Sequence, residues 1–403
     1  MKSRTYHDPL HGAITLNGSD QVESLLIKLI DTPEFQRLRR IRQLDTANLT
    51  FHSGEGSRFT HSLGVMALTR RAFDHLVDQY PSLKPHRCIV LVAALLHDLG
   101  HGAFSHAGEE IFGSQHEFWT IKLIQESSIY DILYTFDPEL PANLELVFTK
   151  KYPVTVISQL VSSQLDCDRL DYLQRDGYFT GAQYGHLDLD RILLALNYDP
   201  DSQSLVITKK GLVAIEHYLT VRYFMYVQVY NHPKNLAARF GLGKIFERAR
   251  VVLATKSLPA DKTVTAWLTQ DLQTLDIKDY LAADDIVFMY HIHLWKNHED
   301  QILADLCRRI QDRDLFKGSE ITNLEDIEEY IQQWQQKLET IGFDPQYYCG
   351  IREALTKGYT LYQQGIAVKT NEGLQEISQI SSLVKTLVQP MRKKWLIHPK
   401  LAN

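Results

Sequence analysis

The pattern of hydrophobic and polar positions predicts a chain that is mainly α-helical. Apolar residues recur at spacings of three and four along most of it, which is the period of a helix with one buried face. This period predicts helices over 20–30, 58–77, 88–97, 116–126, 156–173, 212–254, 284–311 and 324–340. Short strands are expected within 4–16, 204–209 and 365–370. Since the composition shifts near Ser257–Lys262, we expect a helical domain over 1–255 and a smaller, mixed but mostly helical region over 256–403.

A segment rich in arginine follows the first predicted helix. Asp31 or Thr32 can cap a new helix that has Pro33 at its first position. The spacing predicts a helix over 34–44, with apolar side chains on one side and arginines mostly around the others. The arginines are Arg37, Arg39, Arg40 and Arg42. Such a set is typical of a solvated, salt-bridged face, and binding of nucleotide phosphates is the alternative that the pattern leaves open.

The stretch from Cys88 to His106 carries the strongest chemical signal. An apolar helix delivers His97 and Asp98 side by side at its end, and two glycines then favour a turn that contains His101. An imidazole nitrogen and a carboxylate oxygen on adjacent residues can approach one metal ion together. A single histidine at a helix end is usually a core or capping residue. Three histidines and an aspartate within ten residues favour a metal or phosphate site instead.

Composition narrows the class of protein. The chain has 403 residues, of which 44% are hydrophobic and 23% charged, as in a soluble enzyme. Its net charge of −6 makes attraction of the whole molecule to nucleic acid unfavourable. The four cysteines are far apart in sequence, so neither a disulfide framework nor a zinc knuckle is expected. We expect no signal peptide and no membrane span, and therefore a cytoplasmic protein.

Several motifs occur in the order that characterises one enzyme family. They are DPLHG, IDTPEFQRLRRIRQL, RFTHSLGV, HDLGHGAFSH, His116-Glu117, DCDRLDYLQRD and DRDLFKG, spread over about 4–318. Together they resemble the HD superfamily of metal-dependent phosphohydrolases. Within it, the chain is most similar to the deoxynucleoside triphosphate (dNTP) triphosphohydrolases, in the branch of the human sterile-alpha-motif/HD protein. The resemblance implies an HD-domain helical core.

The resemblance also implies a metal centre. Its ligands would be His61, His97, Asp98 and Asp168. Two imidazoles and two carboxylates suit one divalent transition metal such as Fe, Mn, Ni, Co or Zn, and magnesium would accompany the triphosphate. His101, His106 and His116 would lie near the phosphates as catalytic residues. His106 or His116 would donate the proton to the leaving group.

The implied substrate is a dNTP, hydrolysed to deoxynucleoside and tripolyphosphate. Arg58, Arg169 and Arg222 would bind the triphosphate, and Gln43, Tyr172, Asp176 and Tyr230 would surround the deoxyribose. Tyr172 under C2′ would exclude a 2′-hydroxyl. Three positions depart from the human relative: Asp45 replaces a glycine, Arg169 a lysine and Tyr226 a histidine. Base preference is therefore open.

A guanine nucleotide activator, GTP or dGTP, is a further implication of the resemblance. Asp31, Gln36 and Arg39 would bind the guanine base, and Arg4 would lie near its phosphates. Arg191, Lys210, Arg313 and Lys317 match a neighbouring second nucleotide site, where Thr208 lacks the expected positive charge. A nucleotide shared between subunits stabilises assembly. We therefore expect a homo-oligomer, a tetramer of paired dimers.

Three alternatives use the same residues differently. Another HD enzyme, such as a 5′-nucleotidase or a hydrolase of cyclic or polyphosphate nucleotides, could use the same four ligands. A nucleotide sensor could keep the pocket without turnover. A nuclease or nucleic-acid-binding role draws only on the arginine segment and on a basic C-terminal tail, Arg392–Lys394.

Overall fold

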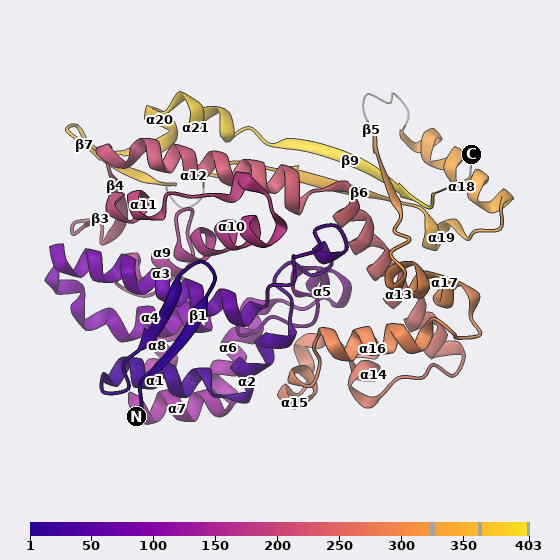
Figure 1. Ribbon diagram of the computed structural model, residues 1–403, viewed down its shortest axis with the longest axis horizontal. Coiled ribbons are helices and arrows are strands. Elements are labelled where there is room, and N and C mark those ends of the chain that lie inside the picture. Colours follow the sequence, from indigo (N-terminus) through magenta and orange to yellow (C-terminus); the bar gives the residue numbers. More distant parts are fainter. Residues whose placement is uncertain (322–326, 362–364, 401–403) are drawn as a thin grey trace.

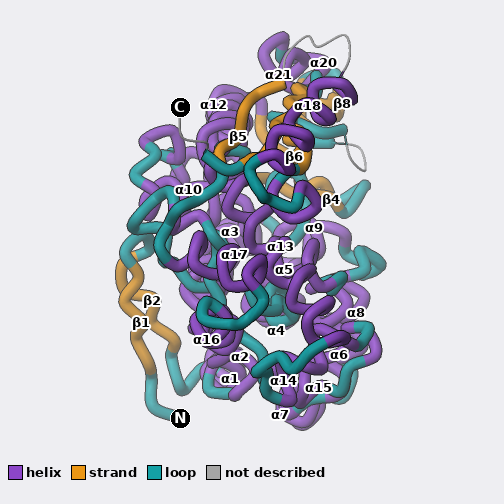
Figure 2. Tube along the Cα trace, turned by 90° about the vertical axis from the view of Figure 1, so that its right-hand side faces the viewer, coloured by secondary structure: helices purple, strands orange, loops and turns teal. Residues whose placement is uncertain are grey.

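The computed structural model describes residues 1–321, 327–361 and 365–400, and these are mainly α-helical, as predicted (Figure 1). Figure 2 shows that strands are confined to a hairpin near the N-terminus and to one end of the molecule. Across these described residues, no helix has the length and apolar character that crossing a membrane requires.

The first hydrophobic core surrounds helix α4. Its helices include α1 (Gln21–Ile30), α3 (Arg58–Gln79), α4 (Arg87–Leu96), α7 (Ser128–Phe136), α8 (Leu140–Phe148), α9 (Thr155–Val161), α10 (Cys167–Thr180), α11 (Leu189–Ala195) and α12 (Leu212–Met225). Every residue from Ile89 to Leu96 is buried, because α4 packs against α3, α8 and α9. A helix that is apolar all round belongs in a core. Helix α4 ends at His97, so the HD pair is delivered from the centre of the domain.

A second core is rich in aromatic side chains and contains the long helix α13. Its helices include α5 (Ser105–Phe112), α13 (Pro233–Thr255), α14 (Lys262–Thr269), α16 (Asp285–Trp295) and α17 (Gln301–Gln311). The Trp119 and Tyr280 rings stack at 3.6 Å, and the Trp267 ring stacks with Tyr280 at 5.2 Å. Helix α6 (His116–Glu126) contributes Trp119 and so links the two cores. The predicted division at residue 255 stays a prediction.

Three small sheets complete the fold. The hairpin β1 (Arg4–Asp8) and β2 (Gly12–Leu16) is antiparallel. The second sheet has the order β3 (Leu196–Asp199), β4 (Ser204–Thr208), β7 (Ala367–Thr370), β8 (Gly373–Glu376), and the third has β5 (Lys317–Ile321), β9 (Met391–His398), β6 (Gly350–Thr356). Strand β7 runs parallel to β4, so the C-terminal region returns to the first core. The predicted basic tail is part of β9.

The remaining helices are short or peripheral. They are α2 (Pro33–Gln36), α15 (Ile277–Leu281), α18 (Ile327–Thr340), α19 (Pro345–Tyr348), α20 (Ile377–Ile380) and α21 (Ser382–Leu387). The start of the helix predicted over 324–340 lies outside the described residues.

The arginine segment, residues 33–44, differs from the predicted helix. Helix α2 has only four residues, a 3₁₀ turn covers 37–40, and the backbone then becomes extended at Ile41. The cause is tertiary, since Arg42 pairs with Ser57 in a β-bridge that a helix could not form. The helix predicted over 156–173 is likewise divided between α9 and α10, where Asp166 caps α10. Helix α8 lies between the helices predicted over 116–126 and 156–173, where the periodicity predicted none.

Candidate active site

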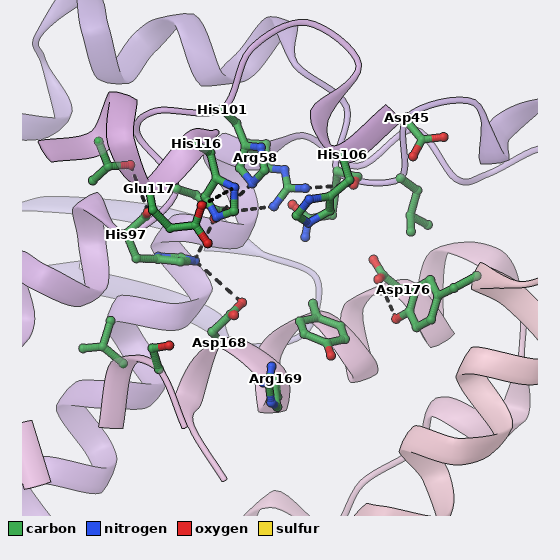
Figure 3. Close-up of a pocket in the computed structure, with 18 of the residues that line it drawn as sticks. Asp45, Arg58, His97, His101, His106, His116, Glu117, Asp168, Arg169 and Asp176 are labelled. Atoms are coloured by element: carbon green, nitrogen blue, oxygen red, sulfur yellow. Dashed lines mark hydrogen bonds and ion pairs between the residues drawn. The ribbon is translucent and has the colours of Figure 1, made fainter. Parts of the chain in front are cut away.

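The four predicted metal ligands converge on one point from three helices. His61 lies in the first turns of α3, His97 and Asp98 at the end of α4, and Asp168 in the first turn of α10. His61 Nε2 is 3.0 Å from Asp168 Oδ1 and 3.3 Å from His97 Nε2. Asp98 brings an oxygen to 3.5 Å from His61 Nε2 and another to 3.4 Å from His97 Nε2. Figure 3 shows His97 and Asp168 facing each other at one end of the pocket.

The orientation of both histidines fits metal binding. His97 Nδ1 lies 2.8 Å from the Ala94 carbonyl oxygen, to which it donates, and His61 Nδ1 lies 2.8 Å from Asp171 Oδ2. With each Nδ1 used in this way, each Nε2 is left for the ligand position, which is the usual arrangement of metal-binding histidines. The donor set, two imidazoles and two carboxylates, suits a divalent transition metal. A divalent ion in this cluster would be held by His61, His97, Asp98 and Asp168.

A buried ion-pair network supports His61 from behind. Asp171 accepts from Arg175 at 2.7 Å and lies 2.6 Å from His11 Nε2, and Arg175 also binds Asp8 at 2.9 Å. A Cβ on Gly64 would lie 2.0 Å from Asp171 Oδ1, so only glycine fits there. The supporting roles of these residues were not predicted from the sequence. Their signal was the DPLHG motif and the i, i+3 spacing of two aspartates in DRLD.

The protonation equilibria reflect this crowding of carboxylates. Burial alone would lower the pKa of His61, but hydrogen bonds with Asp168 and Asp171 outweigh it and raise the pKa to about 10. The pKa of Asp98 is held well below its usual range, against the effect of burial, by the guanidinium of Arg58 at 2.6 Å. The cluster thus holds several ionised carboxylates in the interior, which favours a cation between them.

A second cluster contains the three predicted catalytic histidines. The His101 and His116 rings stack at 4.0 Å, and His106 packs edge-on to His101. Glu109, one turn along α5, joins the cluster: its two oxygens lie 2.6 Å from His116 Nδ1 and 2.7 Å from His106 Nδ1. Glu109 is therefore an addition to the predicted site. Its signal in the sequence is the i, i+3 spacing from His106.

The geometry of this second cluster favours proton transfer and anion binding. Although donor atoms of the four side chains lie within 4.8 Å of one another, the His101 and His116 planes are inclined by only 13°. Lone pairs in parallel planes do not meet on a common ion. Burial lowers the pKa of His116, but Glu109 outweighs burial and the pKa is raised. The pKa of the wholly buried His101 is lowered well below its usual range by burial and by Arg58.

These clusters line one end of a cavity of about 510 Å³. Its lining includes every predicted catalytic and substrate-binding residue except Arg222: Gln43, Arg58, His101, His106, His116, Arg169, Tyr172, Asp176 and Tyr230. Arg222 is buried and donates to Gln164 Oε1 at 2.9 Å, so its substrate-binding role stays a prediction. Arg169 differs because it lines the cavity and its side chain is partly exposed, although its Nε also lies 3.7 Å from the Asp166 carboxylate. Arg169 is thus the more available cation.

The far end of the cavity is formed by aromatic and acidic side chains. Tyr230 donates to Asp176 Oδ2 at 2.8 Å, and burial raises the pKa of Asp176 to about 7. The Tyr172 and Tyr230 rings meet edge to face, and Figure 3 shows Asp176 well separated from His97 and Asp168. Asp45 also lines the cavity in a left-handed conformation, with φ of 43°, and pairs with Arg239 at 2.7 Å.

The predicted activator residues form two groups on the surface. Asp31 pairs with Arg4, and Arg39 donates to Gln36 at 2.8 Å while its guanidinium lies over the Phe59 ring. The second set is divided within one chain. Arg191 lies on α11 and Lys210 in the adjacent turn, whereas Arg313 and Lys317 lie beside β5, on the opposite side of the molecule in Figure 1.

Comparison with known proteins identifies the family. Residues 58–175 match the HD domain and residues 187–398 match the HD-associated region. YwfO, an uncharacterized protein of Bacillus subtilis, is 37% identical over 396 residues, which cover 96% of this chain and 89% of that protein. A Dictyostelium discoideum homolog of the deoxynucleoside triphosphate triphosphohydrolase SAMHD1 is 28% identical over 78% of this chain and 60% of its own length.

The fold agrees with a solved structure over its whole length. A phosphohydrolase from Bacteroides thetaiotaomicron superposes with a TM-score of 0.88 at 26% identity, and the match covers 99% of this chain and 100% of that one. All four residues of the metal cluster lie inside the part that matches the HD domain. This chain therefore belongs to the HD-domain phosphohydrolase family, as a metal-dependent hydrolase.

Proposed function

We propose that the protein hydrolyses dNTPs to deoxynucleoside and tripolyphosphate, by attack of water at the α-phosphorus. The observation that carries the proposal is the order of groups along one cavity. The metal cluster and the histidine cluster lie at one end, Arg169 lies between the two ends, and Tyr172, Asp176 and Tyr230 form the other end. A nucleoside triphosphate has matching chemistry, with phosphates next to its sugar. The Dictyostelium relative, named as a dNTP triphosphohydrolase, supports the same substrate.

The phosphate end combines cation binding with proton donation. A bound divalent ion supplies Lewis-acid polarisation of a phosphoryl oxygen and lowers the pKa of water. Arg169 offers a partly exposed guanidinium at the cavity wall, next to Asp166, while Arg58 fixes the cluster by binding Asp98 and Ser105. His106 or His116, each held through Nδ1 by Glu109, presents Nε2 to the leaving oxygen and donates its proton.

The sugar end supports selection of deoxyribose. Gln43 is buried, and its Oε1 has no hydrogen-bond partner among the described residues, so it can accept from a sugar hydroxyl. Asp176, when ionised, is a second acceptor. The Tyr172 ring packed under C2′ leaves no room for a 2′-hydroxyl. Ribonucleotides are then excluded because their 2′-hydroxyl would clash with the Tyr172 ring, and no charge is involved.

Regulation by a guanine nucleotide, GTP or dGTP, is part of the proposal. Asp31 can accept from the guanine N1–H and 2-amino group, and Arg39 can donate to O6. Because the basic residues of the second nucleotide site are divided between two sides of one chain, a nucleotide bound there would bring two copies together. Leu194 and Val213, exposed apolar residues three positions from Arg191 and Lys210 in sequence, are compatible with a contact between copies, and we propose a homotetramer.

Mass analysis of the products tests the proposal. Purified protein is incubated with each dNTP and matched ribonucleotide, in the presence of manganese or magnesium. The expected products are deoxynucleoside and tripolyphosphate. A dNMP or dNDP product contradicts the mechanism, and release of inorganic phosphate favours another HD enzyme, such as a nucleotidase or polyphosphate hydrolase. Absence of turnover with intact metal binding favours a nucleotide sensor.

A further inference from the structure

Asp285, the first residue of α16, is buried between two segments that line the cavity. Its Oδ2 accepts from the Arg42 backbone N–H at 3.0 Å, and its Oδ1 accepts from the Phe104 backbone N–H at 2.8 Å. The residue is only 3% exposed. A single carboxylate therefore bridges the arginine segment and the catalytic turn, defined here as residues 97–106.

Both bridged positions are next to residues of the site. Arg42 precedes Gln43, and Phe104 lies two residues before His106, at the start of the helix that also carries Glu109. Phe104 and Ser105 have φ of 61° and 49°, a left-handed conformation that is unfavourable for side chains other than glycine. Such a conformation persists only where neighbouring contacts hold it. The hydrogen bond from the Phe104 N–H to Asp285 is one of the contacts that hold this unfavourable conformation.

Ser105 completes the same junction. Its hydroxyl donates to the Arg42 carbonyl oxygen at 2.7 Å and accepts from Arg58 Nε at 3.0 Å. Arg42 is thus held through its N–H by Asp285 and through its carbonyl by Ser105. The Arg42 guanidinium is not part of the junction, because it binds Glu55. The Asp285 carboxylate, the Ser105 hydroxyl and the Arg42 backbone thus fix the arginine segment to the catalytic turn.

We propose that Asp285 is a positioning residue of the site, which holds Gln43 and the His106 helix in register through the two backbone N–H groups. The carboxylate must be ionised to do this, since both oxygens then accept. A protonated carboxyl group directs an O–H at one N–H donor and loses that bond. The effect on catalysis rests on the proposed function, whereas the junction itself does not.

Burial is the main reason why the pKa of Asp285 lies above the usual range of a carboxyl group. Burial raises the pKa of Asp285 to about 6, although the two backbone hydrogen bonds and the Arg42 guanidinium act to lower it. Asp284 beside it acts in the raising direction, and Arg37 is the other charged group that interacts with it. The bridge is therefore expected to open as pH falls through about 6.

The test compares Asp285→Asn with Asp284→Asn. Asp284 caps the same helix and binds Arg40, but it makes no bond to the catalytic turn, and asparagine remains a good cap. We expect Asp285→Asn to lower kcat by about 10- to 100-fold, because the proton donor shifts, and to raise KM by a smaller factor, because Gln43 shifts as well. The acid limb of the kcat profile near pH 6 should disappear in Asp285→Asn and persist in Asp284→Asn.

Hydrogen exchange tests the Asp285 bridge separately from the proposed dNTP hydrolysis, because it does not depend on turnover. In the wild type at pH 7.5, the Arg42 and Phe104 amides should be protected. Protection should fall in Asp285→Asn and, after correction for intrinsic rates, in the wild type at pH 5. If Asp285→Asn does not fold, the wild-type pH series with Asp284→Asn as control decides. Unchanged protection of both amides overturns the proposal. If the amides show the expected pattern of protection but no dNTP is hydrolysed, the Asp285 bridge is supported and the proposed function is contradicted.

Discussion

Asp168 is the ligand whose loss most directly tests the metal centre. It is the only member of the cluster from α10, and it forms the shortest contact, 3.0 Å to His61. Asp168→Ala should lose the bound metal and lower kcat at least about 100-fold, since both depend on the same carboxylate. Elemental analysis and turnover are measured together, with the exposed Asp201→Ala as control. A full equivalent of metal in Asp168→Ala would contradict the ligand assignment.

Glu109 is predicted to set the acidity of the proposed proton donor. Its carboxylate holds both His106 and His116, and it outweighs burial to raise the pKa of His116. A general acid must be protonated, so kcat should fall as pH rises through its pKa. Glu109→Gln removes the charge and should move this alkaline limb to lower pH by about one unit or more, with a lower maximal kcat. The pH profiles of both proteins decide; an unmoved alkaline limb would exclude this role for Glu109.

Asp176 couples the sugar end of the cavity to stability. Burial raises its pKa to about 7, so the folded state binds more protons than the unfolded state between about pH 4 and 7. The free energy of unfolding contributed by this residue should fall as pH rises across that window. Asp176→Asn should flatten the dependence, and Tyr230→Phe should extend it to higher pH, because the Tyr230 hydroxyl lowers the Asp176 pKa. Urea unfolding at several pH values measures the free energy of unfolding of the wild type and both variants. The same pH dependence in all three proteins would contradict the prediction.

The residues that could be predicted from the sequence are those whose chemistry is local. His97 and Asp98 are adjacent, and their helix is apolar, so their convergence needs no knowledge of the fold. The position of Glu109 between two histidines depends on the turn that brings α6 back to α5, and no periodicity encodes that turn. Asp285 is 181 residues from Phe104, and nothing in the local pattern marks it. His61 and Asp168, which are 107 residues apart, were predicted only through the family motifs, and long-range buried partners outside those motifs could not be predicted.

At the scale of elements, the arginine segment shows how tertiary contacts override periodicity. The sequence left a solvated face and a phosphate site open, and one arginine fits neither. Arg37 is buried, donating to the carbonyl oxygens of His101 at 2.7 Å and Ala283 at 3.2 Å. Arg39 is exposed, and Arg40 is paired with Asp284. The segment ends its helix early because its side chains bind elements that are distant in sequence.

A substitution at Arg37 should show whether its buried guanidinium stabilises the fold and the catalytic turn. Arg37→Lys keeps the charge but cannot reach both carbonyl groups with a planar fork. Buried carbonyls would lose their partners, so the free energy of unfolding should fall by about 2–4 kcal/mol, and kcat should fall because the catalytic turn loosens. Arg71→Lys, on the exposed face of α3, is the control. Chemical denaturation gives the stability change; equal stability of both variants would show that the buried guanidinium is dispensable.

At the scale of the whole molecule, the cavity lies where the two hydrophobic cores meet. Helices α9 and α10 of the first core supply one wall, and α5 and α13 of the second supply the other. The C-terminal region then returns through β7 to the first core and closes the fold. The sequence predicts the helical class and the HD core, whereas this return depends on a parallel pairing of 204–208 with 367–370, which no local pattern specifies. A site between two hydrophobic cores can be controlled by any ligand or subunit contact that changes how the cores pack together.

Assembly is the level at which such control is predicted to act. Gln36 and Arg39, two of the residues proposed to bind guanine, belong to the segment whose Arg37 holds the catalytic turn, and Asp31 lies just before it. A nucleotide bound there adds stabilisation in proportion to the logarithm of its concentration over its dissociation constant. We therefore expect GTP or dGTP to convert smaller species to tetramer and to raise turnover of other dNTPs, in the wild type but not in Asp31→Ala. Sizing chromatography and turnover are measured with and without each nucleotide, with ATP as the control. If both proteins are equally assembled and equally active under all conditions, the exposed arginines are a solvated face and the activator site is absent.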